Sequence, residues 1–148
     1  MIVLDTNVVS ELMRREANTA VLDWVDAQPP DELLLTAITA AEICHGIAKL
    51  PDGKRKSALR EAADATLKKD FAGRILAFDE DAAEHYGQLV SARERAGRPI
   101  SMADALIAAI CLSYGASLAT RNTDDFQGIE LTLVNPWTPS ETNEPSAR

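Results

Sequence analysis

Three acidic residues stand where a short apolar segment gives way to a predicted helix. Asp5 ends one apolar segment, Glu42 follows a second, and Asp104 opens a helix rich in leucine and isoleucine. Carboxylates gathered without lysines among them favour a hard divalent cation, most often Mg²⁺ or Mn²⁺. If the fold brings these acids together, the chain carries a metal centre suited to hydrolysis of phosphodiesters.

The order of the predicted elements places the three acids at equivalent positions of an α/β fold. Strands are expected at Ile2–Leu4, Leu33–Thr36, Ile75–Phe78, Ser117–Thr120 and Leu131–Val134, and helices at Val8–Met13, Asn18–Ala27, Thr39–Leu50, Lys54–Lys69, Asp81–Ala96 and Met102–Tyr114. Strands separated by helices predict a parallel sheet with right-handed crossovers. In such a sheet the carboxyl ends of the strands face one crevice, so we expect the acids to converge there.

A further polar cluster, residues 121–125, follows the strand predicted over Ser117–Thr120 and belongs to the same edge of the sheet. It includes Arg121, one of several basic positions suited to the phosphates of a nucleic acid. The net charge of −8 argues against a protein that coats nucleic acid through its overall field. An enzyme acting on nucleic acid is compatible with that charge, because a bound cation neutralises the acidic site and local basic residues contact phosphate.

Each acid also has an alternative explanation as a helix cap. Thr39 and Glu42 fit a capping box. Asp104 lies three residues after Ser101, and Asp5 is placed to cap the helix that follows it. Two carboxylates about 4 Å apart repel by about 4 kcal/mol at an effective dielectric of 20. Caps have no need to share a crevice, whereas a metal site does, so convergence of the acids would favour the metal.

The composition predicts one globular domain. The chain has 148 residues, of which 46% are hydrophobic, and no apolar stretch is long enough to span a membrane. We expect the domain to cover residues 1–137, followed by a flexible polar tail over 138–148. The chain begins directly with a predicted strand, so we expect no signal peptide and a cytoplasmic location. Cys44 and Cys111 fit small core residues of helices.

The ordered motifs resemble those of PIN-domain ribonucleases, specifically the VapC-type toxins of type II VapBC toxin–antitoxin pairs, in the FitB-like branch. The resemblance covers about residues 1–137. It is carried by Ile2–Glu11, Thr39–Ile43 with Gly46, Phe71–Leu76 with Phe78-Asp79, Ala103–Ala109, Ala119–Phe126 and Val134–Trp137.

The resemblance implies a PIN-like three-layer α/β fold, with a twisted parallel sheet of four or five strands flanked by helices. It also implies Mg²⁺- or Mn²⁺-dependent endonucleolytic cleavage of RNA. Asp5, Glu42 and Asp104 match the acidic metal ligands of the family, and Thr6 matches a residue that supports the site. Toxins of this kind pair with a VapB-type antitoxin whose C-terminal segment enters the active site. They usually form homodimers, and larger assemblies with antitoxin on operator DNA.

One position departs from the family pattern. Asn122 stands where family members often carry an acid. Asp125, three residues on, is a common alternative ligand, so the resemblance leaves open which of the two completes the site. With three or four carboxylates, it also leaves open whether one metal or two would bind.

The same residues argue against two other classes of α/β protein and leave one alternative. A haloacid-dehalogenase phosphatase needs an acid two residues after its nucleophilic aspartate, and Asn7 occupies that position. A receiver domain needs an acidic pair at the end of the first strand and a lysine after the last strand, and the sequence has no clear match to either pattern. The remaining alternative is a catalytically inactive PIN-like module that only binds or scaffolds. The identity of the RNA is not encoded in any motif.

Overall fold

The computed structural model describes residues 1–139, which form a five-stranded parallel sheet in the order β3-β2-β1-β4-β5. The strands are β1 (Ile2–Leu4), β2 (Leu33–Thr36), β3 (Ile75–Leu76), β4 (Ser117–Ala119) and β5 (Leu133–Val134). They are short and almost wholly apolar, as expected of strands covered on both faces. The predicted α/β class and parallel sheet are therefore confirmed, with five strands.

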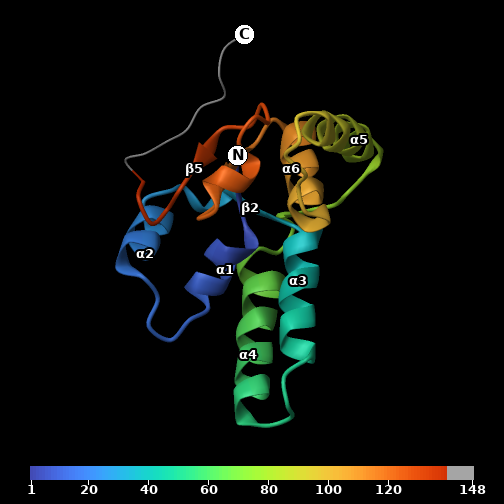
Figure 1. The fold of residues 1–148 in the computed structure, drawn as a ribbon. Helices are drawn as coiled ribbons and strands as arrows, with labels where there is room; N and C mark the ends of the chain where they lie inside the picture. Colours follow the sequence, from blue (N-terminus) through green and yellow to red (C-terminus); the bar gives the residue numbers. More distant parts are fainter. Residues whose placement is uncertain (140–148) are drawn as a thin grey trace.

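Six helices connect the strands. They are α1 (Thr6–Leu12), α2 (Thr19–Asp26), α3 (Ala37–Ala48), α4 (Lys54–Ala65), α5 (Glu80–Arg95) and α6 (Met102–Tyr114), with shorter helical turns η1 (Pro30–Glu32), η2 (Thr66–Asp70) and η3 (Thr123–Phe126). Helices α3 and α4 lie side by side and project as a hairpin, while α5 packs along α6 (Figure 1). Within residues 1–139, no helix combines the length and the apolar character that crossing a bilayer requires.

Two hydrophobic clusters cover the opposite faces of the sheet. Successive residues of a strand point to opposite faces, and the clusters follow that rule. Val3 and Leu118 belong to the cluster under α5 and α6, whereas their neighbours Leu4 and Ala119 belong to the cluster under α1 to α4. The result is the expected three-layer arrangement, with the sheet between two layers of helices.

The structure corrects several predicted boundaries. Helix α3 begins at Ala37, before the predicted start at Thr39, and β3 ends at Leu76. The predicted helix over 54–69 is α4 followed by the wider turn η2. Cys44 is exposed rather than in the core, because its neighbour Ile43 takes the buried side of α3; the prediction holds for Cys111, which is buried. Of the tail predicted over 138–148, residues 140–148 lie outside the described part of the chain.

Candidate functional site

A pocket of about 490 Å³ opens where β1 and β4 end and α1 and α6 begin. It is lined by residues from five regions of the chain: Asp5, Thr6, Asn7, Ser10, Glu11, Arg14, Glu42, Asp104, Arg121, Asn122 and Trp137. The three predicted acids therefore share one pocket. This is the edge of a parallel sheet at which ligands are expected to bind.

Asp5 lies at the centre of the site because β1 pairs with β2 on one side and with β4 on the other. Its carboxylate is buried and caps α1, with Oδ1 accepting a hydrogen bond from the Thr6 backbone N–H at 2.8 Å. The Thr120 hydroxyl donates to Oδ2 at 2.7 Å. Burial raises the pKa of Asp5; the bonds from Thr120 and Thr6 oppose that effect, and the charges of Asp104 and Glu42 add to it.

Glu42 enters the pocket from the second turn of α3. The capping box predicted for it is wrong, because the N-cap of α3 is Thr36, whose hydroxyl accepts from the backbone N–H of Thr39 at 3.2 Å. Glu42 Oε1 instead accepts from the Thr6 hydroxyl at 2.7 Å, and the hydroxyls of Thr6 and Thr39 lie 3.0 Å apart. Since Thr6 has one hydroxyl proton and gives it to Glu42, Thr39 is the donor to Thr6. Helix capping therefore does not account for Glu42.

Asp104 occupies the predicted position in the first turn of α6. Ser101 caps the helix by accepting from the Asp104 backbone N–H at 3.2 Å. The carboxyl group of Asp104 is partly buried in the pocket, and burial is the main cause that raises its pKa. The charges of Asp125 and Glu42 raise the pKa further. The backbone of Asp104 therefore takes part in the cap of α6, while its side chain lines the pocket.

Asn122 and Asp125, the two candidates for a fourth metal ligand, lie in different places relative to the pocket. Asn122 lines the pocket, and its backbone N–H donates to the Thr120 hydroxyl at 3.1 Å. Asp125 lies in η3, is exposed, and is not among the residues that line the pocket. It influences the site through its charge on Asp104.

The donor set fits a hard divalent cation. Carboxylate, hydroxyl and amide oxygens line the pocket, and no lysine does. The pKa values of Asp5 and Asp104 are raised mainly by burial and further by neighbouring carboxylates. A bound cation would offset the repulsion among these negative charges. Within residues 1–139, however, no three His, Cys, Asp or Glu side chains are placed closely enough to hold an ion together. The three acids therefore line one pocket, but their carboxylates do not surround a single ion position.

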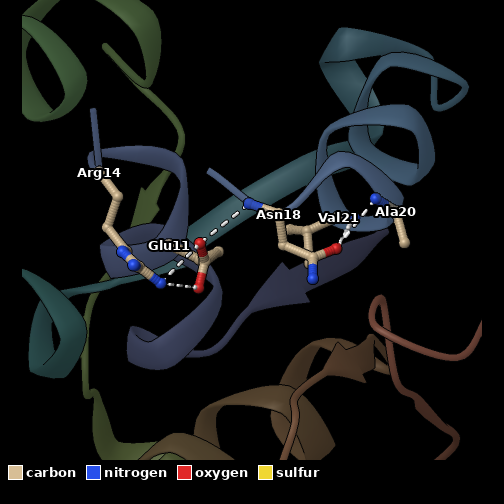
Figure 2. Close-up of polar contacts among 5 residues, drawn as sticks. All are labelled: Glu11, Arg14, Asn18, Ala20 and Val21. Atoms are coloured by element: carbon tan, nitrogen blue, oxygen red, sulfur yellow. Dashed lines mark hydrogen bonds and ion pairs between the residues drawn. The ribbon is translucent and has the colours of Figure 1, made fainter. Parts of the chain in front are cut away.

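Glu11, a buried carboxylate of α1, lines the pocket and is the centre of a group of hydrogen bonds (Figure 2). Glu11 accepts from Arg14 Nη1 at 3.2 Å and from the Asn18 backbone N–H at 3.0 Å. The Asn18 side chain in turn caps α2 by accepting from the backbone N–H groups of Ala20 and Val21. These bonds fix the turn between α1 and α2 and hold Arg14 at the mouth of the pocket.

A family model described as "PIN domain" matches residues 2–130. The chain belongs to the PIN domain family. It is 47% identical over 137 residues to the plasmid stability protein StbB of Pseudomonas syringae pv. tomato, covering 93% of this chain and 99% of that protein. It is 43% identical to the VapC ribonuclease Y4jK of Sinorhizobium fredii, over 95% of this chain and all of that protein (100%).

Solved structures agree with this family. The structure of FitAB bound to an IR36 DNA fragment contains a chain with a TM-score of 0.86 to this PIN domain, at 41% identity. The match covers 93% of this chain and 96% of that one. VapBC-1 from nontypeable Haemophilus influenzae gives a TM-score of 0.76 at 30% identity, covering 93% of this chain and 99% of that one. The resemblance to FitB-like and VapC-type proteins is therefore confirmed.

Sequence reasoning missed several residues of this PIN-domain pocket. Asn7 supports Asp5 through a long hydrogen bond of 3.4 Å, and its position two residues after Asp5 was a signal. Thr120, the buried hydroxyl behind Asp5, ends an apolar segment as Asp5 does. Trp137 belongs to the motif Val134–Trp137 but was given no role at the site, because it reaches the pocket only through the packing of the chain after β5.

Replacing Glu11 by glutamine is expected to lower the stability of the PIN domain at neutral pH but not in acid. The Asn18 N–H, together with Arg14, holds the pKa of Glu11 below its ordinary value of 4.5. A carboxyl with a lowered pKa stabilises the folded state above its unfolded pKa, and that contribution is lost as the pH falls through the folded pKa. Urea denaturation should therefore separate wild type from Glu11→Gln at pH 7 and bring them together near pH 3. A gap of constant size across this range would contradict the assignment.

Replacing Asp125 by alanine is expected to reduce activity less than replacing Asp104 by alanine. Asp125 is exposed and outside the pocket lining, so its loss removes only a nearby charge. Initial rates of RNA cleavage at matched protein and metal concentrations measure the difference. Equal losses in the two variants would contradict this ranking and place Asp125 among the residues on which cleavage depends.

Proposed function

We propose that this PIN domain is a metal-dependent endoribonuclease that acts as the toxin of a VapBC-type toxin–antitoxin pair. The observation that carries the proposal is the convergence of Asp5, Glu42 and Asp104, from three separate segments, on one lysine-free pocket. Relatives that match more than nine-tenths of the chain support it (95% and 93%), since one of them is named a VapC ribonuclease and another, from Neisseria gonorrhoeae, is the toxin FitB at 41% identity.

Asp5, Glu42 and Asp104 are the residues that would hold Mg²⁺ or Mn²⁺. When bound, such a cation lowers the pKa of water and neutralises charge on a phosphodiester. Asn122 provides an amide at the same wall, and Asp125 is close enough to tune Asp104 by its charge. These two residues are the candidates for the remaining ligand position.

The surrounding residues orient the acids. Thr120 and the Thr6 backbone hold the two oxygens of Asp5, and the hydroxyl of Thr6 holds Glu42. These bonds hold the three-residue acidic set at the pocket, since Asp5, Glu42 and Asp104 all line it. Arg121 lines the same pocket and supplies a positive charge for the RNA phosphates.

A VapB-type antitoxin encoded beside the toxin is the proposed partner. Structures of FitAB and of VapBC from Rickettsia felis are described as bound to DNA, and another is described as a toxin–antitoxin complex. We propose that this chain likewise forms homodimers and joins its antitoxin in a larger complex on operator DNA. Size measurement of the purified pair, with and without a promoter fragment, tests this part of the proposal.

The first experiment is cleavage of total cellular RNA by the purified, antitoxin-free protein in Mg²⁺ or Mn²⁺, compared with EDTA. Glu42→Gln is the control, because glutamine keeps an acceptor for the Thr6 hydroxyl and removes only the charge. Discrete fragments that need metal and disappear with Glu42→Gln would establish the nuclease. Failure to cleave RNA together with failure to bind Mn²⁺ would overturn the proposal in favour of an inactive binding module.

A further inference from the structure

Trp137 and Arg121 form a paired wall on the rim of the acidic pocket. The guanidinium carbon of Arg121 lies 4.9 Å from the centre of the Trp137 ring. Trp137 is partly buried and packs against the hydrophobic cluster under α1 to α4, which fixes the indole in place. Both residues line the pocket that holds the three acids.

The backbone of Arg121 is held from both sides. Its N–H donates to Asn7 Oδ1 at 3.2 Å, and its carbonyl accepts from Asn135 Nδ2 at 3.4 Å. Asn135 Oδ1 also accepts from the backbone N–H of Trp137 at 2.9 Å. Asn7 in turn contacts Asp5, so one chain of hydrogen bonds links the acid to the backbones of Arg121 and Trp137.

The two arginines of the pocket differ in what neutralises them. Arg14 is paired with Glu11 at 3.2 Å, whereas no ion pair within residues 1–139 includes Arg121. A guanidinium lying over an indole is attracted to its face but keeps its full charge and its edge N–H groups. Arg121 is therefore an ordered cation with donors to spare, beside carboxylates that act on a phosphodiester.

We propose that Trp137 is a positioning residue for RNA, which holds Arg121 flat at the pocket rim where the guanidinium contacts a phosphate and stacks on a neighbouring base. The inference rests on the proposed ribonuclease function. Arginine planes and aromatic rings are the surfaces on which proteins stack unpaired bases. Because Trp137 orders Arg121 before RNA arrives, less side-chain entropy is lost on binding. The role concerns substrate binding rather than the chemical step.

The test measures binding of short, fluorescein-labelled, single-stranded RNAs of random sequence by fluorescence anisotropy in EDTA, so that nothing is cleaved. Trp137→Leu is expected to weaken binding about 3- to 10-fold, the range of a partly exposed cation–π contact. Trp137→Phe, which keeps a ring beneath the guanidinium, should stay within about 2-fold of wild type. In cleavage assays with metal, Trp137→Leu should raise KM and leave kcat nearly unchanged.

A double-mutant cycle separates positioning from general destabilisation. If Trp137 acts through Arg121, Trp137→Leu combined with Arg121→Gln binds RNA no worse than Arg121→Gln alone. Trp24→Leu is the matched control, because Trp24 is also partly buried against the same cluster but does not line the pocket. It should leave RNA binding unchanged.

Additive losses in the cycle, equal losses in Trp24→Leu, or a loss in Trp137→Phe as large as in Trp137→Leu would each overturn the positioning role. Wild-type protein that binds RNA with all variants unchanged would overturn this inference alone. Wild-type protein that neither binds nor cleaves RNA would overturn the proposed function itself, so the two failures are distinguishable.

Discussion

Replacing Asp104 by asparagine is expected to abolish RNA cleavage and to raise the melting temperature of the metal-free protein. Asparagine cannot supply the charge that a divalent cation needs, and losing several kcal/mol of transition-state stabilisation slows cleavage by at least about 100-fold. In the absence of metal, the same change removes an ionised carboxylate that destabilises the folded protein. Burial, together with the charges of Asp125 and Glu42, raises the pKa of Asp104, which means that the ionised form is disfavoured in the folded state.

The helix dipole works in the opposite direction. A negative charge in the first turn of α6 is favoured by about 0.3–1 kcal/mol. The net pKa of Asp104 is nevertheless raised, so burial and repulsion outweigh the favourable contributions. We expect the melting temperature of Asp104→Asn in EDTA to exceed that of wild type by about 2–5 °C at pH 7.

The pH dependence provides the control. A carboxyl with a raised pKa destabilises the fold only once it is ionised, and the effect develops as the pH rises through the ordinary value of 3.8 and beyond. The gap between Asp104→Asn and wild type should therefore close in acid. A lower melting temperature for the variant at pH 7 would mean that the favourable interaction of the Asp104 charge with the dipole of α6 outweighs burial and repulsion in the free protein.

Replacing Thr120 by valine is expected to lower the free energy of unfolding by about 1–3 kcal/mol, the cost of removing the shorter of two hydrogen bonds to a buried carboxylate oxygen. Thr120 is fully buried, and valine has nearly its shape without the hydroxyl. The change removes the donor to Asp5 Oδ2 and the acceptor for the Asn122 N–H together. Urea denaturation in EDTA measures the loss. Cleavage should fall as well, because this hydroxyl sets the orientation of Asp5.

Thr120→Ser is the matched variant, since it keeps the hydroxyl and removes only a methyl group. It should retain most of the cleavage activity even if the small void costs some stability. If Thr120→Val cleaved RNA as fast as wild type, Asp5 would be oriented sufficiently by the Thr6 backbone N–H and the Asn7 side chain.

Local patterns were enough to predict the elements and the ends at which the acids lie. Apolar segments bounded by polar residues identified all five strands, and the cap at Ser101 was predicted with Asp104 in its first turn. The start of α3 was not, because Thr36 and Thr39 are the same residue type three positions apart. In the structure Thr36 is both the last residue of β2 and the cap of α3, while the Thr39 hydroxyl serves the Thr6 hydroxyl.

By itself, the sequence determined that Asp5, Glu42 and Asp104 would lie at one edge of a parallel sheet, because Asp5 follows a strand and the other two acids lie near the starts of helices. Only the tertiary structure decided what surrounds them. β4 lies next to β1, with Ala119 opposite Leu4, and this pairing brings Thr120 to Asp5 across 115 positions of the chain. Long-range contacts of this kind depend on strand order and packing rather than on local spacing. The same packing places Trp137 against Arg121, and no local pattern of either residue predicts it.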